Sequence, residues 1–237
     1  MRASKSVVYL SQAALVLGLV LAGGMPAHGQ GGGIPGYPDD VRYGYDPREL
    51  AMVPRYCIYT QYFRENVPGG NDAAEIERWY STMGETFHAM HHYCWGLMKT
   101  NRAMFLARTP QLRTFYLNDA VSEYDFVIQR VKPGFPMLPE ILMKKGDNLI
   151  RLGRGALGVQ ELERAIELKP DYWPPYTVLS DYYKATGDIK KAREALETAL
   201  SFSPDAKALK TRLAELNEAN VKRKTAPQSG AQQTPRP

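Results

Sequence analysis

Residues 139–170 read PEILMKKGDNLIRLGRGALGVQELERAIELKP, and residues 173–204 read WPPYTVLSDYYKATGDIKKAREALETALSFSP. Aligned at an offset of 34 residues, the two stretches repeat one pattern of large, small and helix-ending residues. The recurring residues are Leu142, Gly146, Leu149, Gly153, Gly158, Leu162, Ala165 and Pro170, which return as Tyr176, Ser180, Tyr183, Gly187, Ala192, Leu196, Ala199 and Pro204. A constant offset over so many positions indicates an internal structural repeat.

The pattern within each stretch predicts two short helices joined by a turn. Gly153 and Gly187 mark the turn, and small residues such as Gly146 and Ser180 let the paired helices approach closely. Pro ends the second helix because it has no N–H to donate. One such unit cannot bury its apolar face alone, so neighbouring units must stack. Two clear copies therefore need further helices on either side.

This arrangement resembles the tetratricopeptide repeat, whose pattern is W-x2-L-G-x2-Y, then A-x3-F, and then Pro. The second stretch fits best, through Tyr176, Leu179, Ser180 and Tyr183, whereas Lys145 in the first stretch stands where the pattern has Leu. The resemblance implies an all-α fold, a short helical solenoid of tetratricopeptide-like helix pairs with an amino-terminal helical extension. It also implies a protein-binding role, by analogy of fold.

Stacked helix pairs form a concave surface lined by the first helix of each pair. From the helical phase, we expect the residues facing this groove to be Met143, Asp147, Ile150, Arg151, Thr177, Asp181 and Lys184. The best-known repeat proteins of this type hold a peptide's terminal carboxylate with a Lys/Asn/Arg clamp. Asp147 and Asp181 replace the Asn positions of that clamp with negative charge, which would repel a carboxylate. We therefore expect an extended or helical peptide segment as ligand; the alternative is that these residues are simply solvated.

The flanks of the repeats supply the further helices. Residues 109–138 align weakly with the second helix of the pattern, so we expect a degenerate repeat there. Residues 205–224 carry leucines on one face and charges elsewhere, as expected of a capping helix at the end of a solenoid. The composition of residues 225–237 predicts a disordered tail.

Residues 1–29 are typical of a secretory signal peptide. Arg2 and Lys5 precede an apolar run, and small residues lie around a cleavage point before Gln30. The alternative is an uncleaved amino-terminal anchor, and in either case we expect the body of the protein in the periplasm or secreted. Without the two leader charges the net charge falls from +5 to +3, too small and scattered to indicate nucleic acid. Outside the leader no stretch approaches the length of a transmembrane span.

Residues 30–54 form a linker rich in Gly, Pro and Tyr, and we expect a flexible spacer. The alternative is an extended arm whose tyrosines dock on a partner or on the body of the protein. Those tyrosines are Tyr37, Tyr43 and Tyr45.

Residues 55–108 are rich in aromatic side chains, and we expect a short helix opened by Pro54 and then a long helix, or a decayed repeat, over residues 73–106. Asp72 and Glu75 have the spacing of a capping box at its start. An even count of cysteines in an exported chain favours a Cys57–Cys94 disulfide over two buried thiols or a reactive pair.

The only cluster with metal-ligand character lies in this region and contains His88, His91 and His92. Two histidines four residues apart share a helical face and can bind one ion. However, closed metal sites need three or four ligands, so we expect packed aromatic residues and no metal here.

No motif of a nucleophile, a P-loop or a dinucleotide site is present, and residues 153–158 match G-x-G-x-x-G only by letter because no strand precedes them. We therefore expect no enzyme and no cofactor. The best interpretation is a periplasmic scaffold or adaptor that binds protein partners in an envelope assembly, such as polysaccharide export, pilus or outer-membrane machinery. The alternative is a periplasmic protein that handles metal or haem through the three histidines. Self-association through an uncapped end also remains open.

Overall fold

The structure is a computed structural model that describes residues 38–225, apart from residues 39 and 43. The predicted signal peptide, Tyr37, Tyr43 and the predicted tail from residue 226 onward lie outside the described residues. In the described part every regular element is helical, as predicted, and none of its helices has the length and apolar character needed to cross a membrane.

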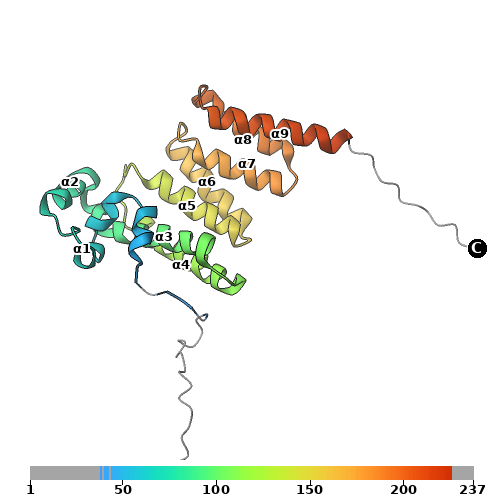
Figure 1. The fold of residues 1–237 in the computed structure, drawn as a ribbon. Coiled ribbons are helices and arrows are strands. Elements are labelled where there is room, and N and C mark those ends of the chain that lie inside the picture. Colours follow the sequence, from blue (N-terminus) through green and yellow to red (C-terminus); the bar gives the residue numbers. More distant parts are fainter. Residues whose placement is uncertain (1–37, 39, 43, 226–237) are drawn as a thin grey trace, which may run out of the picture. The chain divides into compact units, whose positions relative to one another are not determined.

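The two repeats form four helices in succession along the chain, and a fifth helix follows them (Figure 1). They are α5 (Leu138–Arg151), α6 (Gly155–Leu168), α7 (Pro174–Ala185), α8 (Ile189–Phe202) and α9 (Lys207–Thr225). Each helix contacts the next, and α5 also contacts α7. Gly153 and Gly187 have φ of 76° and 88°, so the turns within the two pairs use backbone that glycine adopts without strain. The predicted helix pairs are confirmed.

Close approach of the paired helices explains the small residues of the repeat. A Cβ atom added to Gly146 of α5 would lie 2.9 Å from the backbone oxygen of Gly158 on α6. Because a backbone atom cannot rotate away, the contact between α5 and α6 requires glycine at this position. The next pair uses Ser180 and Ala192 at these places, both buried.

Lys145, the departure from the repeat pattern, does not disrupt α5. Its ammonium group lies 2.6 Å from both Asp125 on α4 and Glu161 on α6. Burial by itself would lower the pKa of Lys145, but its hydrogen bonds to the two carboxylates outweigh burial and raise the pKa. The residue therefore joins three consecutive helices through charge where the pattern has an apolar contact.

The stack continues before α5, and the helix pair there spans the boundary predicted at residue 109. Residues 109–138 contain one long helix, α4 (Pro110–Ile128), and its antiparallel partner α3 (Met90–Asn101) precedes it in the chain. The five residues Arg102–Leu106 between them form a π-helix, η4. A Cβ atom on Gly96 of α3 would lie 2.4 Å from the ring of Tyr124 on α4. A bulky residue on the second helix is thus matched by a glycine on the first.

The segments before α3 are short and irregular. They are η1 (Pro47–Met52), η2 (Arg55–Tyr59), α1 (Phe63–Asn66), α2 (Ala73–Met83) and η3 (Gly84–Ala89). The long helix predicted over residues 73–106 is wrong because Gly84, with φ of 62°, ends α2. The predicted cap is present, since Asp72 accepts from the backbone N–H groups of Ala74 and Glu75.

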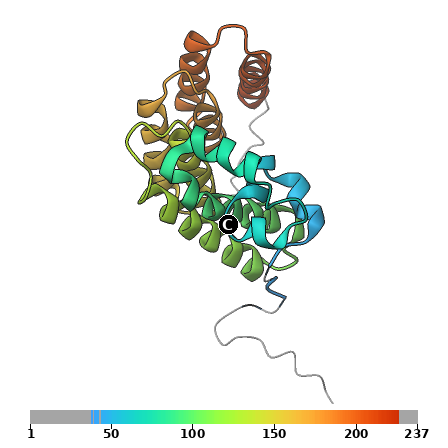
Figure 2. The same cartoon turned by 90° about the vertical axis from the view of Figure 1, so that its left-hand side faces the viewer.

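The predicted disulfide is present between Cys57 of η2 and Cys94 of α3, and both residues are fully buried. It lies in an aromatic core that includes Tyr56, Phe63 and Tyr93. Figure 2 shows these N-terminal segments, in blue and cyan, at the opposite end of the helices from α9, in red.

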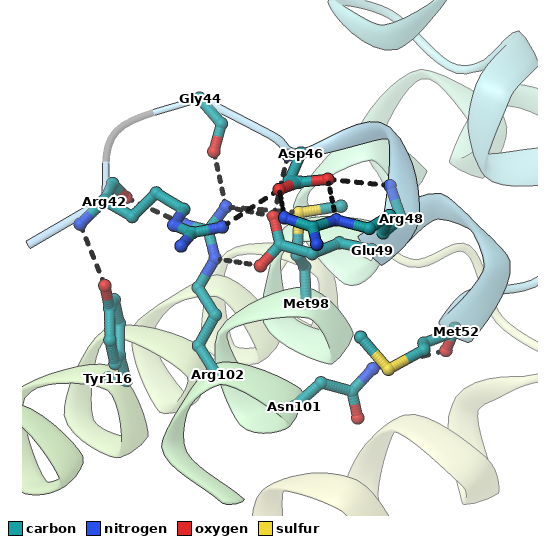
Figure 3. A network of polar contacts seen from close by, with 10 residues as sticks. All are labelled: Arg42, Gly44, Asp46, Arg48, Glu49, Met52, Met98, Asn101, Arg102 and Tyr116. Carbon is teal, nitrogen blue, oxygen red and sulfur yellow. Dashed lines mark hydrogen bonds and ion pairs between the residues drawn. The ribbon is translucent and has the colours of Figure 1, made fainter. Parts of the chain in front are cut away.

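The spacer predicted for residues 30–54 is wrong for residues 44–54, which pack on α3. Asp46 and Glu49 form a capping box that starts η1, and Glu49 is buried. Arg102 donates to both oxygens of Glu49, at 2.7 and 2.9 Å, and to the backbone oxygens of Arg42 and Gly44 (Figure 3). A buried guanidinium with all of these partners holds the arm to the body of the protein. Of the predicted arm tyrosines, Tyr45 docks on the body, where its hydroxyl donates to the backbone oxygen of Asn66.

The last helix closes the apolar core of the repeats. Leu209 and Leu216 of α9 are buried against residues of α7 and α8, and Leu213 is half-buried. The described side chains on the remaining faces of α9 are polar or small, as predicted for a capping helix.

Candidate partner-binding face

The candidate face lies on the first helix of each pair, α5 and α7, and on α9. The 34-residue offset places Lys144, Val178 and Arg212 at one equivalent position of these helices. It places Asp147, Asp181 and Glu215 at the position one turn further along. Side chains at these positions are at least partly exposed, so one stripe of mixed charge crosses three helices.

Two of the predicted groove residues are buried, and a third is partly covered. Met143 and Thr177 are each 8% exposed, and the Thr177 hydroxyl donates to the backbone oxygen of Pro174. Ile150 is half-buried and packs against Gly158 on α6. Met143 packs in the apolar core of the repeats, and the helical phase alone does not determine which positions of α5 and α7 face inward.

The other predicted residues are accessible, and both aspartates are paired with arginine. Asp147 accepts from Arg151, one turn along α5, at 3.0 and 3.1 Å. Asp181 of α7 accepts from Arg212 of α9 at 2.9 and 2.8 Å. The negative charge that would repel a carboxylate is therefore locally balanced. Lys184 is exposed beside these pairs.

Arg212 was missed by the sequence analysis, although a signal for it was present. Arg212 lies 34 residues after Val178, at the equivalent position of α9. From this position its side chain reaches Asp181 on α7. For Asp147 the corresponding residue is Val178, which has no donor, and Arg151 of the same helix takes its place.

The corresponding face of α3 is covered by the chain itself. Gly96 of α3 lies close against the next helix, α4, just as Gly146 of α5 lies close against α6. We therefore align α3 with α5 at an offset of 50 residues. By this register Cys94, Leu97 and Asn101 correspond to Lys144, Asp147 and Arg151. Cys94 is bonded to Cys57, Leu97 is buried in the same core, and the amide of Asn101 donates to the backbone oxygen of Met52. The N-terminal segments thus occupy this part of the face, and the open part begins at α5.

The amino-terminal end of α5 is also engaged internally. The hydroxyl of Tyr93 donates to Glu140 at 2.6 Å. Burial and the nearby charge of Glu140 raise the pKa of Tyr172 to about 12, and burial also raises the pKa of Tyr93 well above its ordinary value. Glu140 therefore belongs to a buried tyrosine cluster, and the accessible residues of α5 are those nearer its carboxyl end.

The three histidines are neighbours, with the ring centroids of His91 and His92 4.2 Å apart, and each also has contacts of its own. His88 packs edge-on against Tyr80, and a ring nitrogen of His91 lies 3.0 Å from the backbone oxygen of His88. Burial lowers the pKa of His91. His92 pairs with Glu123 at 2.5 Å and stacks on Phe126 of α4. Within the described part of the chain, no three His, Cys, Asp or Glu side chains are grouped so as to hold a metal ion.

Comparison with known families explains the repeat. The sequence profile of the tetratricopeptide repeat matches residues 139–172 and 174–206. These residues match the tetratricopeptide repeat twice in succession. The match confirms the predicted period, and repeats of this family suggest a scaffold for protein–protein interaction that is typically not an enzyme.

Similarity of the chain to other proteins beyond the repeat is distant. No curated protein matches the chain. One matching solved structure is the first tetratricopeptide domain of Spaghetti (RPAP3), bound to the HSP90 peptide SRMEEVD. It is 15% identical, with a TM-score of 0.39, and the match covers 54% of this chain and 97% of that one. This similarity is too low to support an argument about the ligand.

Proposed function

We propose that this protein is a periplasmic scaffold that binds a segment of a partner protein on the open face of α5 and α7. The assembly it serves would be one of the cell envelope, such as polysaccharide export, pilus or outer-membrane machinery. The observation that carries the proposal is the accessible stripe of charged residues on two tetratricopeptide repeats, closed on one side by the N-terminal segments and on the other by α9.

Charge pairing on this face favours a partner segment with both signs of charge. Asp147 with Arg151, and Asp181 with Arg212, present neighbouring acceptors and donors at the surface. Exposed pairs of this kind contribute roughly 0–1 kcal/mol to folding stability. A partner can therefore exchange contacts with them at little cost to the fold, and the charge pattern then contributes specificity.

The periplasmic location is supported by the leader and by the buried disulfide, which forms in oxidising compartments. It is tested by fractionating cells and sequencing the amino terminus of the purified protein. We expect the mature chain to start at Gln30 and to be found outside the cytoplasm.

The partner-binding role is tested by affinity capture from solubilised cell envelope, comparing the unchanged protein with Asp147→Arg/Asp181→Arg. The matched control is Glu163→Arg/Glu197→Arg, because these exposed glutamates are also one period apart, on the second helices α6 and α8, and receive the same charge change. We expect a partner to be recovered with the unchanged protein and the control and to be lost with the first variant. Circular dichroism checks that all three are equally helical.

Two results would count against the proposal. Equal recovery with both double variants would mean that the face of α5 and α7 is not used. Recovery of no specific partner by the unchanged protein would contradict the scaffold role itself.

A further inference from the structure

Tyr62 has a strained backbone in an exposed position. Its φ of 69° and ψ of −56° are those of a γ-turn, and the N–H of Phe63 donates to the backbone oxygen of Gln61, two residues earlier, at 2.9 Å. This turn is rare and strained for a residue with a Cβ, and strained backbone is concentrated at functional sites. Glycine would adopt the turn more easily, so the tyrosine side chain needs an explanation.

The strain holds a large aromatic ring at the surface beside a second ring. Tyr62 is 40% exposed, and its ring packs edge-on against the ring of Trp95 of α3, with the two centroids 5.4 Å apart. Trp95 is itself only partly buried. Two neighbouring aromatic rings are thus accessible from outside.

A pocket of about 330 Å³ adjoins these rings. It lies between α3, α4 and the N-terminal arm, and its walls include Trp95, Tyr116, Lys99, Asp119, Glu123 and Arg42. Gly44 of the arm also lines it, and the hydroxyl of Tyr62 lies 4.0 Å from the place of a Cβ on that glycine. Tyr62 therefore stands at the rim of the pocket.

The charges of the pocket are balanced within the protein. Lys99 pairs with Asp119 at 2.8 Å and also with Glu123, which accepts from His92. Each remaining arginine of the pocket has its own carboxylate, Arg42 with Asp46 and Arg102 with Glu49. An ionic ligand would have to break one of these pairs. The side chains of Asp119 and Arg42 are nevertheless 35% and 45% exposed. A ligand can therefore reach the lone pairs of Asp119 and the N–H groups of Arg42.

A ligand that fits this pocket is uncharged, has several hydroxyl groups and has one apolar face. A pyranose ring has these properties, because its C–H face packs on an aromatic ring while its hydroxyls donate to carboxylates and accept from N–H groups. Pockets that combine aromatic walls with a few placed polar groups are the usual form of small-ligand sites. We propose that the pocket beside Trp95, with Tyr62 at its rim, binds a neutral saccharide unit.

The test uses saturation-transfer NMR and tryptophan fluorescence on the purified protein. The probes are neutral tetrasaccharides of glucose, galactose, mannose and N-acetylglucosamine, with a tetragalacturonate and a tyrosine-containing tetrapeptide for comparison. We expect at least one neutral tetrasaccharide to bind and the acidic one to bind more weakly. We expect the fluorescence of Trp95 to change on binding.

Tyr62→Gly is the decisive variant because it separates a functional role from a structural one. Relief of the strain and loss of the ring packing on Trp95 act in opposite directions on stability, so Tm should change little, while removing the ring should weaken saccharide binding roughly tenfold. Asp40→Gly is the matched control. Asp40 has a similar positive φ of 64° but does not line this pocket, so the control should gain stability and keep its affinity.

Three results would overturn the proposal. The first is the absence of binding by any neutral tetrasaccharide at millimolar concentration. The second is equal affinity of Tyr62→Gly and the unchanged protein. The third is binding of the tetrapeptide or the acidic sugar in preference to every neutral probe. An Asp119→Ala variant, which removes the partly exposed carboxylate of the wall together with its ion pair to Lys99, checks the second result: it should also weaken binding.

Discussion

The N-terminal part of the molecule (residues 44–128) and the repeat part (residues 138–206) are both helical but are held together differently. In the repeat part, neighbouring helices meet through small residues at a fixed period, and the core is made of aliphatic and tyrosine side chains. In the N-terminal part the contacts have no period, and a disulfide, a buried ion pair and an aromatic core join segments far apart in the chain. The comparison indicates that periodic packing relies mainly on close contact between neighbouring helices, whereas the irregular segments depend on links between residues far apart in the chain.

The largest expected effect comes from Arg102. In Arg102→Met, the buried carboxylate of Glu49 loses its guanidinium partner and keeps only the backbone N–H of Asp46, so we expect a loss of about 3–5 kcal/mol in the free energy of unfolding. Urea unfolding followed by circular dichroism measures it. In the double variant Glu49→Leu/Arg102→Met no unpaired charge is left, and most of the loss should be recovered. If the double variant is as unstable as the single one, the carbonyl contacts of Arg102 to the arm matter more than the ion pair.

The disulfide should come next. Replacing Cys57 and Cys94 by Ala frees a loop with a sequence separation of 37, and loop entropy alone predicts a loss of roughly 3–4 kcal/mol. Hydrogen exchange followed residue by residue should show faster exchange in the N-terminal part and little change in α6 to α8. Equal acceleration in both parts would mean that they unfold as one unit, which would remove the distinction drawn above.

Two glycine substitutions compare close packing in the two parts directly. Gly96→Ala places a methyl group against the ring of Tyr124, and Gly146→Ala places one against the backbone of α6. Each substitution should lower the free energy of unfolding by about 1–3 kcal/mol. A second change, Tyr124→Leu, should restore part of the stability lost in Gly96→Ala because a side chain can be made smaller. No side-chain change should fully restore Gly146→Ala. Thermal unfolding of the single and double variants decides this.

Alkaline pH should affect the N-terminal part more steeply. Burial raises the pKa of Tyr56, Tyr93 and Tyr124 above the ordinary value, so above pH ~10 the unfolded chain loses these protons first and stability falls as pH rises. Each such group contributes up to ~1.4 kcal/mol per pH unit. Tyr124→Phe should therefore reduce the slope of unfolding free energy against pH above pH ~10.

Tyr172→Phe provides the comparison from the repeat part. Because the pKa of Tyr172 is raised only to about 12, its effect should be confined to the interval between pH ~10 and that value. Denaturant unfolding at a series of pH values measures both slopes. Identical behaviour of the two variants would contradict the assignment of deeper burial to Tyr124.

The sequence predicted the repeat part well because the interactions there are local. Glycine at the turns, small residues between paired helices and proline after the second helix act within one unit, and a constant spacing makes them visible. The capping helix and the disulfide could be predicted for similar reasons, from one apolar face and from an even cysteine count in a chain with a leader.

The candidate sites could be predicted only in part. Asp147, Arg151, Asp181 and Lys184 are accessible as expected, but the buried positions of Met143 and Thr177 depend on how the helices tilt against each other. The spacer and the long helix were wrong because a buried arginine from α3 holds the arm, and because a single glycine, Gly84, ends α2.

By itself, the sequence determined a helical fold with two helix pairs that match the tetratricopeptide repeat, a polar cap and one disulfide, because each follows from spacing or composition. Only the tertiary structure decided which surfaces are open. Arg102 meets Glu49 across 53 residues, Arg212 meets Asp181 across 31, and the rings of Tyr62 and Trp95 meet beside a pocket. Contacts between distant residues depend on how finished helices pack, and no local pattern encodes that packing.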